Sequence, residues 1–127
     1  MSPHVMVVED DESAREMMDI ALSQAGFAVS AVSNGEAALD LLHRCRFALV
    51  LLDVHMPRIN GLAVLAAMGA FRSRPPVLMV SANTQSTTIR QALSLGCAGY
   101  LAKPFSPRDL VERARWALAG PEPVTLH

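Results

Sequence analysis

The sequence predicts an α/β domain in which a five-stranded parallel sheet is covered by helices on both faces. Residues 47–52 form an uninterrupted apolar run that is followed by a single acid, Asp53. Such a run is typical of a central parallel strand, because helices bury both of its faces. Four other short apolar segments alternate with helical segments and are joined to them by short connections. This alternation predicts five strand–helix units, which is a doubly wound (βα)5 arrangement.

The first half of the chain carries clear boundary signals for its elements. We expect a strand over residues 5–8 and then a helix that begins with a capping box of Ser13 and Glu16 and ends at Gly26. A second strand is expected over residues 27–32, before Asn34-Gly35 opens the next helix. The apolar stripe of that helix is predicted to consist of Ala38, Leu41, Leu42 and Cys45. The third strand is the run that ends at Asp53.

The second half repeats the alternation. A short helix is predicted over residues 62–71, a strand over 77–80 and a strand over 99–102. The helix between these two strands is expected to be the most mobile, because β-branched threonines lower its helix propensity. Its inward residues are predicted to be Ile89, Ala92 and Leu93. The last helix should begin at Ser106 as N-cap, with Pro107 and Asp109 in its first turn, and should end at Gly120.

Composition indicates one globular domain, residues 1–120, followed by a tail or the start of a linker at 121–127. The chain has 127 residues, of which 51% are hydrophobic and 18% charged. A net charge of −1 gives no support for binding to nucleic acid or to an anionic membrane. With no leader pattern and no membrane-length apolar run, we expect a cytoplasmic protein. Cys45 and Cys97 have no metal-ligand spacing, and Cys45 is predicted to be a reduced thiol in the core.

Polar residues follow four of the five predicted strands. Because right-handed crossovers bring the carboxyl ends of parallel strands to one edge of the sheet, these residues should meet there. They are Glu9 and Asp10, Asp53, Ser81, and Lys103. Three carboxylates would repel one another, and Mg²⁺ with oxygen ligands would resolve the repulsion. A lysine and a hydroxyl beside the metal could hold a phosphoryl group, which implies formation of an aspartyl-phosphate.

Four motifs give the chain a specific resemblance. They are Val-Val-Glu-Asp-Asp at residues 7–11, Leu-Asp-Val-His-Met-Pro at 52–57 with Gly61, Val-Ser-Ala at 80–82, and Gly-Tyr-Leu-Ala-Lys-Pro-Phe at 99–105. On these motifs the chain resembles the response-regulator receiver domains of two-component signalling over about residues 4–119. The resemblance implies a flavodoxin-like strand order of 2-1-3-4-5.

The resemblance also implies a role for each residue of the cluster. Asp53 would be the phosphoacceptor, and the donor would be a histidine of a sensor kinase or of a histidine phosphotransfer protein. Mg²⁺ would be bound by Asp10, Asp53 and the backbone carbonyl of His55, with Glu9 acting largely through water. Lys103 would pair with the phosphoryl oxygens and precede a cis proline. Ser81 would hydrogen-bond the phosphoryl group, and Tyr100 would swing inward behind it. Such a domain catalyses only its own phosphorylation and dephosphorylation and is not otherwise an enzyme.

Three positions depart from the commonest family pattern. Glu9 stands where aspartate is commoner and Ser81 where threonine is commoner, and both substitutions keep the required chemistry. His55, two residues after the acceptor, is less usual. Its side chain should lie near the phosphoryl site, either altering the lifetime of the phosphoryl group or remaining a solvated bystander.

Two partner surfaces are expected. By resemblance, the first helix and the loop after the fifth strand form the side that docks the kinase, which makes Met17, Ile20, Pro104 and Phe105 candidate contacts. The fourth helix, fifth strand and fifth helix would carry the output and could form a dimer. Trp116 projects opposite the apolar stripe of the last helix, where it is either a docking anchor or covered by the tail. The domain itself is expected to contact neither nucleic acid nor membrane.

Other functions remain open at this stage. The chain could be a switch without an output domain or a piece of a longer protein that carries one. A small phosphatase with an aspartate nucleophile would need a second acid two residues later, where His55 stands. A flavodoxin-like cofactor binder would need a phosphate-binding loop after the first strand, where acids stand instead. Another α/β binding module is the remaining alternative.

Overall fold

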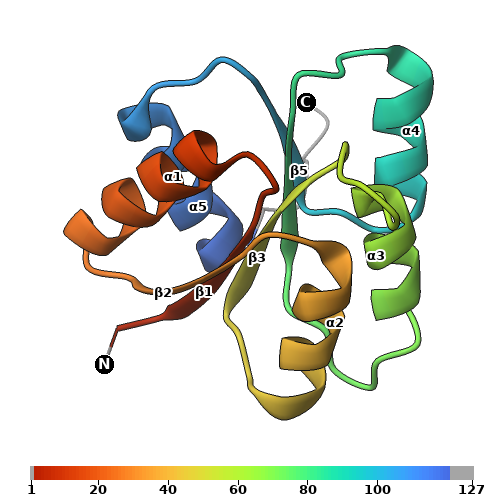
Figure 1. Ribbon diagram of the computed structural model, residues 1–127, viewed down its shortest axis with the longest axis horizontal. Coiled ribbons are helices and arrows are strands. Elements are labelled where there is room, and N and C mark those ends of the chain that lie inside the picture. Colours follow the sequence, from red (N-terminus) through yellow and green to blue (C-terminus); the bar gives the residue numbers. More distant parts are fainter. Residues whose placement is uncertain (1, 121–127) are drawn as a thin grey trace, which may run out of the picture.

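The structure is a computed structural model that describes residues 2–120, in which five strands alternate with five helices. Figure 1 shows the elements in chain order. Their bounds are β1 His4–Val8, α1 Glu12–Gln24, β2 Ala28–Val32, α2 Gly35–Arg44, β3 Leu49–Asp53, α3 Gly61–Met68, β4 Val77–Ser81, α4 Ser86–Ser94, β5 Gly99–Ala102 and α5 Pro107–Ala119.

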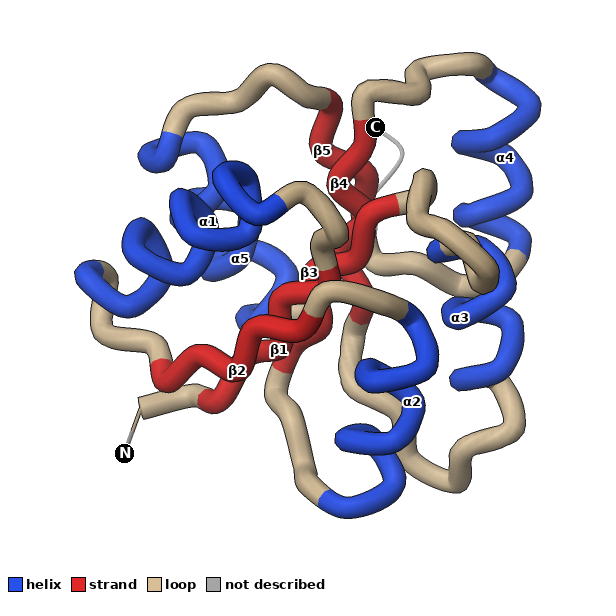
Figure 2. The backbone as a smooth tube through the Cα atoms, in the orientation of Figure 1, coloured by secondary structure: helices blue, strands red, loops and turns tan. Residues whose placement is uncertain are grey.

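The strands form one parallel sheet in the order β2-β1-β3-β4-β5, which confirms the expected topology. Figure 2 shows α1 and α5 on one side of the sheet and α2, α3 and α4 on the other. In the ladder Asp53 is level with Val80, and Ser81 is level with Ala102. The carboxyl ends of β3, β4 and β5 therefore reach the same edge of the sheet.

The continuous apolar character of β1, β3 and β4 comes from burial on both faces. Alternate residues of each strand belong to two separate cores. The core beneath α1 and α5 contains Val5, Val7, Leu49, Leu51, Leu78 and Val80. The core beneath α2, α3 and α4 contains Met6, Val8, Val50, Leu52, Val77 and Met79. All of these side chains are fully buried, so neither face of the three central strands tolerates a polar residue before the strand ends.

Two helix boundaries differ from the sequence prediction. The N-cap of α1 is Asp11, whose carboxylate accepts a 2.8 Å hydrogen bond from the Ala14 amide, so the predicted cap at Ser13 was wrong. Aspartate caps a helix as well as serine does, and Asp11 comes earlier in the chain. Helix α3 ends at Met68 rather than at residue 71, because residues 69–71 form tight turns with amides bonded three residues back. The predicted N-cap of α5 at Ser106 is confirmed, and the structure shows that Asp109 completes a capping box with it.

Two side chains predicted to point inward are exposed instead. Cys45 lies just past the end of α2 in extended backbone (φ −132°, ψ 154°), so it no longer follows the helix face and is exposed. On α4 the buried residues are Thr88 and Ala92, one turn apart. Leu93 lies outside that stripe and is 56% exposed. The prediction of a core thiol at Cys45 and of an inward Leu93 was therefore wrong.

The longest helices, α1 and α5, each contain 13 residues. A membrane-spanning helix needs about 20 apolar residues. Within residues 2–120, accordingly, no helix is long and apolar enough to cross a membrane.

Candidate functional site

The structure brings together, at the carboxyl edge of the sheet, the polar residues that end β3 and β4 and those that follow β1 and β5. Glu9, Asp53 and Ser81 are buried, whereas Asp10 is exposed. Carboxylate oxygens of Glu9, Asp10 and Asp53 lie within 4.8 Å of one another. Three acids in so small a volume, two of them largely shielded from water, create strong repulsion that a cation must relieve.

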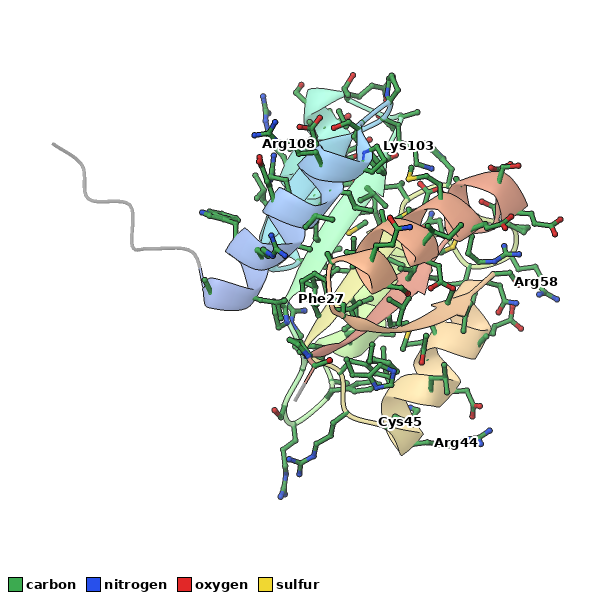
Figure 3. The ribbon with its side chains drawn as sticks, turned by 90° about the vertical axis from the view of Figure 1, so that its left-hand side faces the viewer. Phe27, Arg44, Cys45, Arg58, Lys103 and Arg108 are labelled. Atoms are coloured by element: carbon green, nitrogen blue, oxygen red, sulfur yellow. The ribbon has the colours of Figure 1, made fainter. Side chains whose placement is uncertain are left out.

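Lys103 supplies one such cation from the end of β5. Its Nζ atom contacts Oε1 of Glu9 in a short ion pair and lies 3.1 Å from Oδ2 of Asp53. The backbone amide of Lys103 donates to the carbonyl of Ser81 (2.9 Å), which fixes the root of the side chain beside β4. Figure 3 shows Lys103 at the top of the molecule, above the sheet. The Lys103–Pro104 peptide bond is cis, as the resemblance implies.

Two local features hold the loops that carry the acids. The guanidinium of Arg15 donates to the carbonyls of Glu9 (2.9 Å) and Asp10 (3.3 Å), which ties the start of α1 to the end of β1. The Gly61 amide donates to the carbonyl of Val54 (2.7 Å). A Cβ atom at Gly61 would lie 2.0 Å from the backbone oxygen of Asp53, so only glycine lets the β3–α3 loop pack against the strand end. Sequence reasoning missed Arg15, because an arginine inside an amphipathic helix carries no distinctive signal.

Burial and mutual repulsion alter the ionisation of the cluster. Burial is the largest cause that raises the pKa of Glu9 to about 7; the Asp53 carboxylate raises it further, and Lys103 opposes both. For Lys103 the largest single effect is burial, which lowers the pKa of the ammonium. The contacts with Glu9 and Asp53 outweigh burial, and the pKa of Lys103 is raised overall.

Asn83, in the loop between β4 and α4, joins the other polar residues of the site. Its backbone amide donates to Oγ of Ser81 (3.0 Å), and its backbone carbonyl accepts from the Tyr100 hydroxyl (2.5 Å). Its side-chain nitrogen lies 3.3 Å from Nε2 of His55. Sequence reasoning did not single out Asn83, because no local pattern indicates a junction between His55, Ser81 and Tyr100.

The donor set fits a hard divalent cation. The three clustered side chains offer only carboxylate oxygens, and Mg²⁺ prefers one or two carboxylates completed by water. The exposed position of Asp10 leaves room for water ligands on the solvent side. The His55 amide donates to Oδ1 of Asp53 (3.3 Å), which directs that carboxylate without using its other oxygen.

The amino-acid sequence also matches a known protein family. A model of the response regulator receiver domain matches residues 5–115. The chain belongs to this family. It is therefore the receiver domain of a response regulator, a signalling domain of two-component systems.

Curated relatives support the assignment along nearly the whole chain. The DNA-binding response regulator MtrA of Mycobacterium tuberculosis is 36% identical over 115 residues, which cover 91% of this chain and 50% of that protein. The uncharacterized transcriptional regulatory protein YcbL of Bacillus subtilis is 37% identical over 113 residues, covering 89% of this chain and 50% of that protein. The receiver chain thus spans about half the length of the curated relatives that it matches.

Solved structures support the same fold. The chemotaxis response regulator CheY4 of Vibrio cholerae superimposes with a TM-score of 0.87 at 28% identity, covering 92% of this chain and 99% of that one. A putative response regulator from Chloroflexus aurantiacus gives a TM-score of 0.88 at 29% identity, covering 94% of this chain and 99% of the other.

The raised pKa of Glu9 predicts how stability depends on pH in metal-free buffer. A carboxyl whose pKa rises from 4.5 to about 7 on folding binds more protons in the folded state between those values. The free energy of unfolding should therefore fall as the pH rises from 4.5 to about 7. Asp53→Asn should flatten this slope, because it removes a carboxylate that raises the Glu9 pKa. Urea unfolding in EDTA across this range measures both slopes.

Asp19→Asn provides the control for that comparison, since it makes the same charge change on α1 away from the cluster. Its slope should match that of the wild type. Equal slopes for the wild type and Asp53→Asn would contradict the assignment of the pH dependence to the Glu9–Asp53 pair.

Proposed function

We propose that this receiver domain is a phosphoacceptor switch, in which Asp53 accepts a phosphoryl group from a sensor histidine kinase or a histidine phosphotransfer protein. The observation that carries the proposal is the cluster at Asp53: a nearly buried carboxylate, two neighbouring carboxylates and a lysine in contact with it. Clustering three acids at one edge of an apolar sheet is unfavourable for folding, so a purely structural role does not explain the arrangement.

The chemistry is transfer between two nucleophiles. A carboxylate oxygen of Asp53 attacks phosphorus, the bond from phosphorus to the donor histidine nitrogen breaks, and the imidazole leaves. Lys103 lies where its ammonium can balance charge on the phosphoryl oxygens. Glu9, Asp10, Asp53 and the backbone carbonyl of His55 would hold Mg²⁺, which when bound would neutralise the acids and the incoming phosphoryl oxygens. Turnover is limited to the domain's own phosphorylation and dephosphorylation.

Ser81 and Tyr100 would convert this modification into a change of shape. The Oγ atom of Ser81 accepts from the Asn83 amide, so its hydroxyl proton is free to be donated to a phosphoryl oxygen. Movement of Ser81 toward the phosphoryl group would carry the Asn83 loop, and the hydrogen bond from Tyr100 to Asn83 would pass that movement to β5.

The surface of α4, β5 and α5 is the proposed output face, open to an output protein, a fused output domain or a second copy of the chain. Trp116 is 47% exposed there and packs over Gly99 of β5. A Cβ atom added at Gly99 would lie 3.7 Å from the Trp116 ring. Glu112 and Arg113 flank it in a shallow hollow. Exposed tryptophan is a common anchor residue in interfaces. The alternative that the tail covers Trp116 concerns residues outside the described range.

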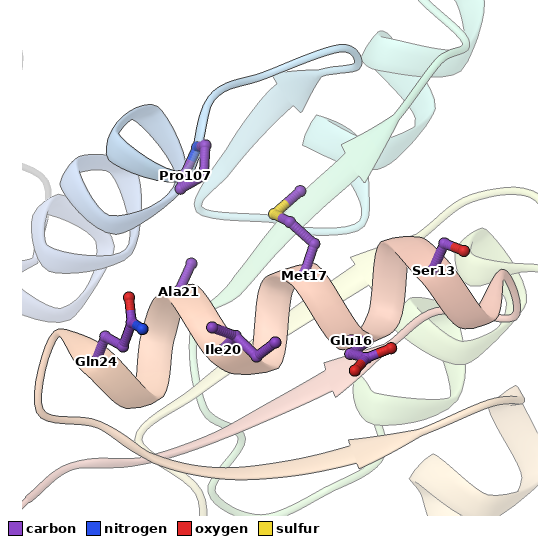
Figure 4. Close-up of a pocket in the computed structure, with 7 residues that line it drawn as sticks. All are labelled: Ser13, Glu16, Met17, Ile20, Ala21, Gln24 and Pro107. Atoms are coloured by element: carbon purple, nitrogen blue, oxygen red, sulfur yellow. The ribbon is translucent and has the colours of Figure 1, made fainter.

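The face of α1 and α5 is the proposed docking side for the phosphoryl donor. Figure 4 shows Met17 and Ile20 of α1, and Pro107 at the start of α5, among the residues that line a shallow groove. Ile20 is 50% exposed in that groove. An adjoining apolar hollow is lined by Met17, Pro104 and Phe105, beside Lys103. A donor seated there would approach the acidic cluster from the side on which Lys103 lies.

The names of the relatives bear on the output. MtrA is a DNA-binding response regulator, and this chain matches about half of it. A separate or fused output that regulates transcription is therefore consistent with the proposal, with the receiver domain itself contacting neither DNA nor membrane and acting in the cytoplasm. A phosphatase finds no support, because His55 occupies the position of the required second acid.

Phosphorylation should require both Asp53 and a divalent cation. Incubation with a small phosphodonor and Mg²⁺ should add one phosphoryl group to the wild type, and intact mass spectrometry should detect it. Asp53→Asn or EDTA should abolish the adduct, because each removes part of the reacting centre. Asp19→Asn should be phosphorylated like the wild type. An adduct that persists in Asp53→Asn would contradict the proposal.

His55 should influence the lifetime of the phosphoryl group. Its imidazole reaches Asn83 across the mouth of the site, so His55→Ala opens a path for water to phospho-Asp53. We expect decay to become roughly two- to tenfold faster, which corresponds to a loss of about 1 kcal/mol of shielding. Loss of label from the phosphorylated protein measures the rate. Unchanged decay would make His55 a solvated bystander.

Trp116 and Ile20 should have separable effects, because they lie on different faces. Trp116→Ala should weaken self-association or output binding without slowing phosphorylation by a small donor. Ile20→Ala, a matched loss of an exposed apolar side chain, should leave self-association unchanged. Sedimentation of the phosphorylated proteins makes the comparison. If both variants self-associate like the wild type and Trp116→Ala still binds its output, the anchor role fails.

A further inference from the structure

A second candidate site lies at the opposite edge of the sheet, at the amino ends of β3 and β4. A pocket of about 240 Å³ forms between the α2–β3 and α3–β4 connections, and its lining includes Cys45, Arg46, Phe47, Phe71, Ser73 and Arg74. Figure 3 shows Arg44 and Cys45 at the bottom of the molecule and Lys103 at the top. The pocket is therefore remote from the acidic cluster, and nothing in the proposed phosphoryl transfer uses it.

The pocket carries positive charge that no acid among residues 2–120 compensates. Within that range no carboxylate lines it, and Asp53 is the only acid between Leu41 and Arg108 in the sequence. Across residues 2–120 Arg46 takes part in no ion pair or side-chain hydrogen bond. Arg74 donates to the neutral carbonyl of Gly96 (2.6 Å), which orients the guanidinium without cancelling its charge. By contrast, the neighbouring Arg44 is paired with Asp40 at 2.7 Å.

Two aromatic side chains, Phe47 and Phe71, contribute apolar surface to the pocket. Phe47 is buried just before β3, and the ring of His43 stacks on Phe71 at a centroid distance of 4.7 Å. Aromatic rings and arginines are the residue types enriched at protein–protein contacts, where an apolar side chain enters a pocket and charges surround it. The pocket, with aromatic rings inside and arginines at its rim, therefore has the residue types expected on one side of a protein–protein interface.

We propose that this pocket docks an acidic segment of a partner protein, with one apolar side chain of the segment inserted on Phe47 and Phe71 and its carboxylates on Arg46 and Arg74. Guanidinium groups bind carboxylates in a planar, two-point geometry, which favours this charge pairing. A volume of about 240 Å³ admits one large side chain, whereas small-molecule sites begin at roughly 300 Å³.

Nucleic acid is the less suitable partner. It is usually bound by a stripe of many cations along a groove, and here two guanidiniums flank a small pocket that also holds two aromatic rings, on a chain of net charge −1. Because the pocket and the acidic cluster lie at opposite edges of the sheet, a partner bound here leaves Asp53 accessible. The domain can then be tethered to one protein while it exchanges phosphoryl groups with another.

The test uses a fluorescein-labelled peptide, Glu-Asp-Glu-Phe-Glu-Asp-Glu, and fluorescence anisotropy at low salt. The wild type should bind it saturably, and Arg46→Glu should weaken binding by roughly tenfold or more, as expected for reversal of a contacting charge. Arg115→Glu, the same charge change at an exposed arginine of α5, should stay within roughly twofold of the wild type. A peptide with alanine in place of phenylalanine should bind more weakly than the parent.

Three outcomes would overturn the proposal. The first is no saturable binding by the wild type, and the second is equal weakening by Arg46→Glu and Arg115→Glu, which indicates general electrostatic attraction. The third is tighter binding of a single-stranded oligonucleotide of the same charge, lost in Arg46→Glu, which would assign the pocket to nucleic acid. Thermal unfolding of Arg46→Glu verifies the fold, and its phosphorylation at Asp53 should be unchanged, so this test is independent of the proposed function.

Discussion

The contact of one lysine with two buried carboxylates is the interaction on which the carboxyl edge of this domain depends. Glu9 and Asp53 emerge from strands that are apolar on both faces, so no water compensates their charge from below. Lys103, from the far end of the sheet, supplies that compensation, and its contacts join β5 to β1 and β3 across β4. Removing the lysine would leave buried, unpaired charges, which are far more costly than a lost surface ion pair.

The same contact explains why the site is poised for exchange. One cation for three clustered acids leaves net negative charge, and burial together with the neighbouring Asp53 carboxylate raises the pKa of Glu9. A divalent cation and a phosphoryl group would each change this balance, the first by neutralising acids and the second by offering Lys103 new oxygens. The loop that would sense the change is already connected, because Asn83 bonds to Ser81 on one side and to Tyr100 on the other.

Charge is distributed unevenly between the two edges of the sheet, although the net charge of the chain is close to zero. The acids gather where β1 and β3 end, and uncompensated arginines surround the pocket where β3 and β4 begin. A net charge of −1 describes only the average over the chain. The pocket is locally basic because the α2–β3 and α3–β4 connections contain arginines and no acid. Two faces of opposite sign can recognise different partners.

The sequence by itself determined the alternation of elements, the strand order through its resemblance, and the residues at the carboxyl edge, since continuous apolar runs and the residues that end them are local signals. It could not determine that Cys45 and Leu93 are exposed. One residue past a helix end the backbone leaves the helical path, and one step along a helix turns a side chain by about 100°, which is enough to move it from the core to solvent. The Asn83 junction, the Arg15 brace and the arginine-rimmed pocket each join residues from different elements. Only the tertiary structure decided these contacts, because they depend on how separate loops pack together.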